Sequence, residues 1–291
     1  MKIAIFGNTN KKKESAEPVK ILFEALREKK ACVMTDRRFF DFLKEELGDT
    51  NIVNEIIEND DFCADLALSI GGDGTFLNTA SRIGNKNIPI LGINTGRLGF
   101  LTDVSSNEIV PAINEIYSNN YFIEQRSVIH LKTDNLGFKQ YPHALNEIAI
   151  LKQDSSSMIA IDVHINGEYL NTYQADGLII ATPTGSTAYS MSVGGPLAVP
   201  QSDILIISPV ASHSLNVRPL VIPDSWTVEL SVSSRSKNFL VALDGRPSVF
   251  SQQYKLIITK SDFNIRVIKR PQHTFFNTLR NKLMWGIDKR S

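Results

Sequence analysis

An acidic residue stands inside a glycine-rich turn at residues 71–75, which read GGDGT. The three glycines permit positive φ angles and carry no Cβ atoms, so backbone N–H groups there can approach a phosphate. The helix expected over FLNTASRI adds a favourable dipole at its first turn. The carboxylate of Asp73 would repel a phosphate, so phosphate binding does not explain why this residue stands in the turn. Asp73 either caps the helix that we expect to start at Thr75, or it faces a hydroxyl beside the phosphate and accepts its proton.

The common nucleotide motifs do not account for this turn. A Walker loop ends in Gly-Lys-Ser/Thr, and the chain has no such segment. A dinucleotide fingerprint needs a third glycine at the position of Leu77. The turn is therefore a candidate phosphate-binding site that matches neither of these two motifs.

A second candidate is the pair Asn146 and Glu147 in ALNEIAI (144–150), at the start of an apolar strand. Side by side they offer an amide and a carboxylate, which suit ribose hydroxyls or an adenine amino group. The alternative interpretation is an ordinary polar strand end.

A third candidate is the segment ADGLIIATPTGSTAYSMSVGGP (175–196). An apolar strand over Leu178–Ala181 precedes a loop rich in hydroxyl groups and small residues. Nearly twenty such residues are too many for one polar turn. A further Asp-Gly pair follows a strand in LDGRPS (243–248).

The elements around these candidates change character along the chain. Strands are expected at 2–7, 65–70 and 88–96, and helices at 17–31 and 106–119, a βαβ rhythm that predicts a parallel sheet. After about residue 125, strands follow one another without helices. They are expected within 158–173, with a hairpin turn at Asn166-Gly167, and at 178–181, 226–234, 239–245 and 263–270, while 274–286 is expected to be helical.

These patterns predict an α/β plus all-β fold. The N-terminal parallel-sheet α/β domain would cover residues 1–124 together with about 272–291, and would carry GGDGT. A β-sandwich domain would cover residues 125–271. The C-terminal helix would pack back on the first domain.

Composition narrows the classes of partner. The 291 residues suffice for two domains, 42 % are apolar, and 31 basic side chains balance 31 acidic ones. Zero net charge gives no general attraction to nucleic acid or to an anionic membrane. Two cysteines cannot build a disulfide framework or a zinc site. Without a signal-peptide pattern or a membrane-spanning apolar run, we expect a cytoplasmic protein.

In chain order, GGDGTFL, GINTGRLGFL, NEIAI, DGLIIATPTGSTAYSMSVGGP and LDG resemble the NAD kinase family, over residues 65–250. GGDGT alone is also shared with lipid kinases and phosphofructokinases, whereas the long fourth segment is more specific. The resemblance implies a kinase, a transferase that uses ATP to phosphorylate the 2′-hydroxyl of the adenosine ribose of NAD, giving NADP.

The resemblance also implies roles for individual residues. Asp73 would accept the proton, Asn146 and Glu147 would hold NAD, and Asp176 would meet its nicotinamide end. The full set implied around NAD is Gly74, Phe100, Asn146, Glu147, Gln174, Asp176, Thr187, Ala188, Tyr189, Ser190, Ser192 and Asp244. The set assigned to ATP and its phosphates is Gly71, Gly72, Thr75, Thr184 and Arg246. Arg246 is not matched to a family residue, and it either restores positive charge or lies on the rim of the site. Gln174 is a departure, because many members carry arginine at this position.

No Asp, Glu or His cluster has recognisable metal spacing, so a divalent ion such as Mg²⁺ is expected to arrive with ATP, held mainly by phosphates and waters. No tightly bound organic cofactor is expected. The resemblance implies a homodimer or homotetramer in which a neighbour contributes to the site. NAD and ATP are the expected substrates, with no nucleic acid or membrane partner.

Two other functions stay open on the sequence. A lipid or sphingoid kinase of the same superfamily would need an apolar pocket, whereas residues 182–192 are polar. A non-catalytic dinucleotide-binding sensor would not need an acid in the glycine turn. A hydrolase is disfavoured, because SHS at 212–214 lacks the glycines of a nucleophile elbow.

Overall fold

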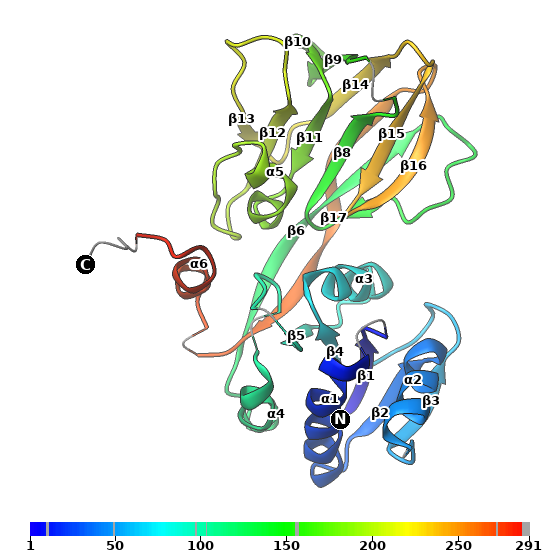
Figure 1. The fold of residues 1–291 in the computed structure, drawn as a ribbon, viewed down its shortest axis with the longest axis vertical. Coiled ribbons are helices and arrows are strands. Elements are labelled where there is room, and N and C mark those ends of the chain that lie inside the picture. The colour runs from blue at the N-terminus through cyan, green and yellow to red at the C-terminus, as the bar shows by residue number, and fades with distance from the viewer. Residues whose placement is uncertain are drawn as a thin grey trace. The chain divides into compact units, whose positions relative to one another are not determined.

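The structure is a computed structural model that describes residues 1–9, 12–48, 50–96, 98–102, 104–154, 157–271 and 273–286, without the side chains of residues 12–15 and 47. The chain forms two compact units: unit 1 comprises Met1–Gln125 and Ile265–Ser291, and unit 2 comprises Arg126–Asn264. In Figure 1, unit 1 carries the blue and cyan elements and the red C-terminal ones, and unit 2 runs from green to orange. Of the predicted C-terminal part of the first domain, residues 272 and 287–291 lie outside the described residues.

Unit 1 alternates strands and helices. Its elements are β1 (Lys2–Gly7), α1 (Lys12–Glu28), β2 (Cys32–Asp36), α2 (Arg37–Leu47), β3 (Val53–Ile57), β4 (Leu66–Gly71), α3 (Asp73–Ile83), β5 (Ile90–Asn94), the 3-10 turn η1 (Ser106–Glu108), α4 (Ile109–Tyr117), the start of β6 (Phe122–Thr133), the end of β17 (Leu256–Lys269) and α6 (Phe275–Leu283).

The sheet of unit 1 is parallel, in the order β17-β5-β4-β1-β2-β3. Ile3 and Ile5 of β1 pair with Leu66 and Leu68 of β4, and all four side chains are buried. Such runs of β-branched and aliphatic residues suit strands that are covered on both faces. The parallel-sheet α/β domain predicted from the βαβ rhythm is confirmed.

The boundaries of α1 differ from the expected 17–31. Its face of Val19, Leu22 and Leu26 is buried as predicted, but the helix runs from Lys12 to Glu28. The Ala31 N–H bonds the Leu26 carbonyl at 3.1 Å, and Lys30 takes a left-handed φ of 52°. This tight turn ends the helix before the predicted last residues.

The elements β2, α2 and β3 were not predicted. Asp36 ends β2 and caps α2 at once, because its carboxylate accepts the Phe39 N–H at 2.8 Å. With the strand and helix joined directly, no glycine or proline marks the boundary. Phe39 and Phe42 then stack with ring centroids 5.5 Å apart, inside the core of unit 1.

Unit 2 contains the remaining elements. They are the rest of β6 and β17, β7 (His143–Ala144), β8 (Glu147–Lys152), β9 (Ile159–Ile165), β10 (Glu168–Ala175), β11 (Gly177–Ala181), the 3-10 turn η2 (Thr184–Thr187), the short helix α5 (Tyr189–Ser192), β12 (Ile204–Val210), β13 (Leu220–Pro223), β14 (Val228–Ser233), β15 (Asn238–Leu243) and β16 (Arg246–Ser251).

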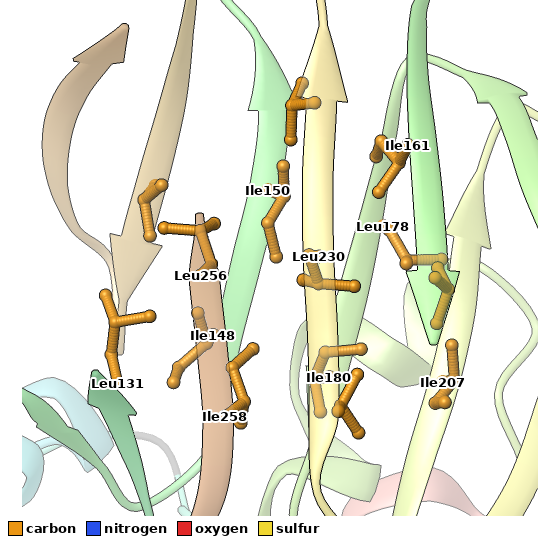
Figure 2. Close-up of a cluster of buried hydrophobic side chains, with 14 of the residues drawn as sticks. Leu131, Ile148, Ile150, Ile161, Leu178, Ile180, Ile207, Leu230, Leu256 and Ile258 are labelled. Atoms are coloured by element: carbon orange, nitrogen blue, oxygen red, sulfur yellow. The ribbon is translucent and has the colours of Figure 1, made fainter. Parts of the chain in front are cut away.

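Two antiparallel sheets form unit 2. One has the order β10-β9-β14-β17, with β6 on β17 and β7 on β6, and the other has the order β13-β12-β11-β8-β15-β16. Figure 2 shows side chains of both sheets in one apolar cluster, with Ile161 and Leu230 from the first sheet and Ile150 and Leu178 from the second. This shared core is that of the predicted β-sandwich.

Local turn chemistry is confirmed in unit 2, and some strand ends are corrected. Asn166 and Gly167, with φ of 51° and 82°, join β9 and β10 as a two-residue hairpin. The strand expected from Trp226 begins only at Val228, and Trp226 is 41 % exposed. The strand expected at 263–270 is the second half of β17, and β12 and β13 were not predicted.

The predicted C-terminal helix is present as α6, and it belongs to unit 1. Phe275 of α6 and Phe100 have ring centroids 6.3 Å apart. Among the described helices, none combines the length and apolar character that crossing a membrane requires.

Candidate functional site

The glycine turn leaves the carboxyl end of β4, an edge where open α/β sheets bind ligands. Gly71 is required by its surroundings, since its φ is 155° and a Cβ would lie 2.4 Å from Thr75 Oγ1. Gly72 and Gly74 have no such steric reason, because a Cβ on either would meet no atom within 4 Å. Open backbone at these two positions leaves room for a ligand beside the first turn of α3.

Asp73 is the first residue of α3, so the helix starts two residues earlier than expected. The cap position is Gly72, and no side chain caps the helix. The interpretation of Asp73 as a helix cap is therefore wrong. Its carboxylate instead bonds a second segment of unit 1.

That second segment is residues 98–102. Asp73 Oδ2 accepts the Phe100 N–H at 2.9 Å, and Oδ1 accepts the N–H groups of Leu101 at 3.0 Å and Thr102 at 3.1 Å. The Thr102 hydroxyl adds a bond to Oδ1 at 3.0 Å. A Cβ on Gly99 would lie 2.0 Å from Oδ1, so this close approach requires glycine. These hydrogen bonds hold residues 98–102 against α3, and they also fix the orientation of the Asp73 carboxylate.

The same contacts set the protonation of Asp73. Burial raises the pKa, but hydrogen bonds from Phe100, Leu101 and Thr102 and the charge of Lys282 outweigh burial, so the pKa lies below its ordinary value. Asp73 is thus ionised at neutral pH. Lys282 of α6 lies 3.4 Å from Oδ2, and no sequence pattern pointed to it.

Phe100, predicted as a pocket wall, is 9 % exposed. The Lys282 ammonium lies over the Phe100 ring, 4.6 Å from its centroid, in a cation–π contact. In unit 1 the structure therefore gathers the glycine turn, Asp73, Phe100 and Lys282. Arg97 and Asp103 on either side of residues 98–102 lie outside the described residues.

In unit 2, the turn between β15 and β16 organises Asn146 and Glu147. The Asp244 carboxylate accepts the N–H groups of Leu145 at 2.8 Å, Asn146 at 2.8 Å and Glu147 at 3.2 Å. Asp244 has a left-handed φ of 48°. This backbone conformation is unfavourable for a residue other than glycine, and the tight turn requires it here. Asp244 thus acts on the backbone that presents the Asn146-Glu147 pair.

Glu147 is 8 % exposed and carries an unusual carboxyl. Burial and the neighbouring Asp244 carboxylate raise its pKa to about 7, against a smaller lowering by the Tyr189 N–H. Its Oε2 is buried without a hydrogen-bond partner among the described residues. A buried acceptor without a donor suits a ligand hydroxyl or amino group.

The hydroxyl-rich loop packs against Asn146. The Thr182 hydroxyl bonds the Leu145 carbonyl at 2.6 Å, and a Cβ on Gly185 would lie 2.1 Å from the Asn146 carbonyl oxygen. This contact lies between the strand end and η2, and it requires glycine at 185. The loop is an ordered part of the sandwich.

Several predicted hydroxyls of this loop have partners within unit 2. Thr187 donates to the Thr184 carbonyl at 3.2 Å, Ser192 donates to the Tyr189 carbonyl at 2.8 Å, and Ser190 and Ser208 share a bond of 3.1 Å. Thr184 also accepts a bond from the buried Arg126 at 3.4 Å. Tyr189, next to Ala188, is 37 % exposed. Arg126 is a buried cation that the sequence did not single out.

Arg246, predicted at phosphate, is engaged within unit 2. Its guanidinium donates to the carbonyls of Leu243 at 3.0 Å, Tyr141 at 3.3 Å and His143 at 2.7 Å. It supports the turn that contains Asp244.

Gln174 and Asp176 are not brought to this cluster. Asp176 precedes β11 and pairs with Lys152 at 2.7 Å, whereas Glu147 pairs with Ala181 at the other end of the strand. Gln174 is exposed on β10, and its carbonyl accepts the His213 N–H at 2.9 Å. Within one chain these two residues stand a strand's length from Glu147.

Over the part of the chain that the structure describes, no three His, Cys, Asp or Glu side chains lie close enough to hold a metal ion together.

Two family models match the chain. The ATP-NAD kinase N-terminal domain matches residues 3–121, and the ATP-NAD kinase C-terminal domain matches residues 145–270. An NAD kinase of Bacteroides fragilis is 55 % identical over 290 residues, covering all of both chains. An NAD kinase of Porphyromonas gingivalis is 43 % identical over 285 residues, covering 98 % of each chain.

Solved structures agree on the fold. Yeast NADH kinase complexed with NADH has a TM-score of 0.86 at 22 % identity, covering 99 % of this chain and 89 % of that one. An NAD kinase from Archaeoglobus fulgidus in complex with ATP has a TM-score of 0.74 at 25 % identity, covering 98 % and 99 %.

Proposed function

Given that the chain belongs to the ATP-NAD kinase family, we propose that it transfers the γ-phosphoryl group of ATP to the 2′-hydroxyl of the adenosine ribose of NAD and forms NADP. The observation that carries this proposal is the Asp73 carboxylate, held by hydrogen bonds from Phe100, Leu101 and Thr102, next to the open backbone of Gly72 and Gly74. That pairing supports the proposal, because phosphoryl transfer needs a proton acceptor beside groups that can bind phosphate.

The transfer asks little covalent work of the protein. The ribose oxygen forms a bond to the γ-phosphorus, the bond from that phosphorus to the β–γ bridging oxygen breaks, and ADP leaves. Asp73 takes the hydroxyl proton. A divalent ion, carried in with ATP as part of that substrate, supplies charge neutralisation.

Recognition of NAD is assigned to unit 2. Oε2 of Glu147 is the proposed acceptor for a hydroxyl or amino group of the dinucleotide, with Asn146 beside it. Asp244 and Arg246 are proposed to act indirectly, by holding the backbone of residues 145–147 and the turn after β15.

The two alternatives make different demands. A lipid kinase needs an apolar surface beside its acceptor, whereas residues 182–192 present hydroxyls and an exposed tyrosine. A sensor has no need for an ionised acid in the glycine turn. Incubation with γ-labelled ATP and either NAD or a sphingoid base separates the three. We expect label in NADP alone; label in lipid, or NAD binding without transfer, would contradict the proposal.

Glu147→Gln is expected to weaken NAD binding by about 5-fold, because a hydrogen bond to a charged acceptor exceeds a neutral one by roughly 1 kcal/mol. In the unmodified protein NAD binding should tighten as pH rises through about 7, where Glu147 ionises. The variant should lack that dependence. NAD titrations between pH 6 and about 8.5 measure it, with ATP affinity as the control. A pH-dependent variant would contradict the role of Glu147.

The ionisation of Glu147 should also make the stability of the protein depend on pH. The folded pKa of Glu147 lies near 7, above its ordinary 4.5, so the folded state holds this proton more tightly than the unfolded chain. The stability contribution of Glu147 is therefore lost as pH rises from about 4.5 to about 7. Melting curves of Glu147→Gln should lack this decline.

A homodimer or homotetramer is proposed, with a neighbouring copy contributing to each site. Support comes from β11, because Asp176 lies five residues before Ala181, the partner of Glu147, which at about 3.4 Å per residue is a separation of roughly 17 Å. A second copy is the proposed source of the acid at the nicotinamide end. Light scattering at assay concentration should give at least a dimer; a fully active monomer would contradict it. The proposed location is the cytoplasm, where NAD and ATP both occur.

A further inference from the structure

The C-terminal helix α6 places a cation on the acid of the glycine turn. Lys282 Nζ lies 3.4 Å from Asp73 Oδ2 and 4.6 Å from the centroid of the Phe100 ring. The side chains of Lys282 and Asp73 are each 31 % exposed, so solvent and substrate can reach the pair. These two residues are 209 positions apart in the sequence.

The helix is well placed to hold this cation. Thr274 caps α6 by accepting the Asn277 N–H at 3.2 Å. Phe275, Leu279 and Lys282 have the i, i+4, i+7 spacing of one helix face. Phe275 contacts Phe100 at one end of that face, and Lys282 reaches the same ring at the other.

The segment before α6 is anchored as well. Arg270 donates to Glu115 at 2.5 Å and to Glu108 at 3.3 Å, which ties the end of β17 to α4 and η1. The base of α6 is therefore fixed within unit 1 by a largely buried guanidinium, whose side chain is 8 % exposed.

The two oxygens of Asp73 have different surroundings. Oδ1 accepts three bonds, from Leu101 and Thr102. In the described part of the chain, Oδ2 accepts the Phe100 N–H and the longer contact from Lys282. Oδ2 is therefore the less crowded oxygen, and a substrate hydroxyl would approach it at the position of the 3.4 Å contact, beside Lys282.

A carboxylate next to bound phosphates is electrostatically unfavourable unless a cation accompanies it. We propose that Lys282 is a positioning residue for phosphoryl transfer, which holds Asp73 Oδ2 toward the acceptor hydroxyl and offsets its charge as ATP binds. The inference rests on the proposed function of Asp73 as the proton acceptor. Lys282 keeps its own proton throughout: the hydroxyl proton moves to Oδ2, the ribose oxygen bonds to phosphorus, and ADP departs.

The test compares Lys282→Met, which keeps the aliphatic stem but not the charge, with Lys282→Arg, which keeps the charge. We expect kcat of Lys282→Met to fall about 10-fold, between the small effect of an exposed ion pair and the large effect of a buried one. Lys282→Arg should retain most of the activity. The KM for NAD should stay within about 2-fold in both, because Lys282 is not assigned to NAD recognition.

Arg280→Met is the matched control. Arg280 lies on the same helix and is exposed. Its guanidinium donates to the side-chain oxygen of Asn277, three residues earlier in α6. It should leave kcat unchanged. Melting temperatures of all three variants should stay within about 2 °C of the parent, since the pairs concerned are partly or fully exposed.

A second arm separates action through Asp73 from any independent effect. In an Asp73→Asn background, Lys282→Met should lower the residual rate by less than 2-fold, because the effect of Lys282 depends on the Asp73 carboxylate that this background lacks. A full 10-fold loss in that background would overturn the proposal, because Lys282 would then act without Asp73. An unchanged kcat in Lys282→Met alone would overturn it as well. If the parent enzyme forms no NADP, the proposed function itself fails.

Discussion

Asp73→Asn should lower the rate of NADP formation by roughly 10²–10⁴, the usual contribution of a positioned general base. An amide is not basic and cannot take the ribose proton. NAD should still bind, because Asn146 and Glu147, the proposed recognition pair, lie in unit 2 and are unchanged. The measurement is a turnover rate and an NAD titration on one preparation.

The variant should also be less stable, because asparagine offers a single acceptor. Oδ1 faces three donors from Leu101 and Thr102, so the amide oxygen should take that position. The amide nitrogen then faces the Phe100 N–H and Lys282, donor against donor. The cost should be about 1–3 kcal/mol.

Thr102→Val is the control for Asp73→Asn. It removes the hydroxyl bond to Oδ1 but leaves the carboxylate and three backbone bonds in place. Its turnover should remain within about 10-fold of the parent, while its melting temperature falls by a few degrees. A Thr102→Val variant as inactive as Asp73→Asn would mean that loop order, and not proton transfer, limits the rate.

Asp244→Ala should impair both folding and NAD binding. It leaves the N–H groups of Leu145, Asn146 and Glu147 without their acceptor and puts alanine at a φ of 48°. Removing one partner of a buried charged network costs roughly 3–5 kcal/mol. The melting temperature should fall by about 10 °C, and the apparent constant for NAD should rise about 100-fold.

Asp244→Asn gives a graded comparison. Asparagine tolerates the left-handed conformation and can still accept the bonds of Asn146 and Glu147. The loss of stability in Asp244→Asn should be about half of the loss in Asp244→Ala. It also removes the neighbouring charge that helps to raise the pKa of Glu147, so the pH dependence of NAD binding should move to lower pH. If Asp244→Ala weakens ATP binding alone, Asp244 has been placed wrongly.

Elements with a strong local signal could be predicted from the sequence. The buried strand β1, the run that forms β4 and the Asn166-Gly167 hairpin each carry their pattern within a few residues. The junction of β2 and α2 has no such signal, because Asp36 serves as the last strand residue and as the cap. Strand ends such as the one at Trp226 depend on tertiary packing.

Candidate site residues could be proposed from the sequence, but their contacts within the chain could not. Asp73 meets residues 27 to 29 positions later and a lysine 209 positions later. Asp244 meets residues 97 to 99 positions earlier. Contacts of this range follow from the fold and leave no periodic trace. The same holds for Arg246, whose charge suggested phosphate but whose donors bond backbone carbonyls.

The most direct test of the kinase activity is product formation by the purified chain with ATP, a divalent ion and NAD. Phosphorus NMR of the product should show a new phosphomonoester at the 2′-position of the adenosine ribose, formed in step with ADP and absent when ATP is omitted. Asp73→Asn should yield it at no more than about a hundredth of the parent rate. ADP release without that phosphomonoester, or an equal rate in Asp73→Asn, would contradict the assignment of Asp73 as the proton acceptor of an NAD kinase.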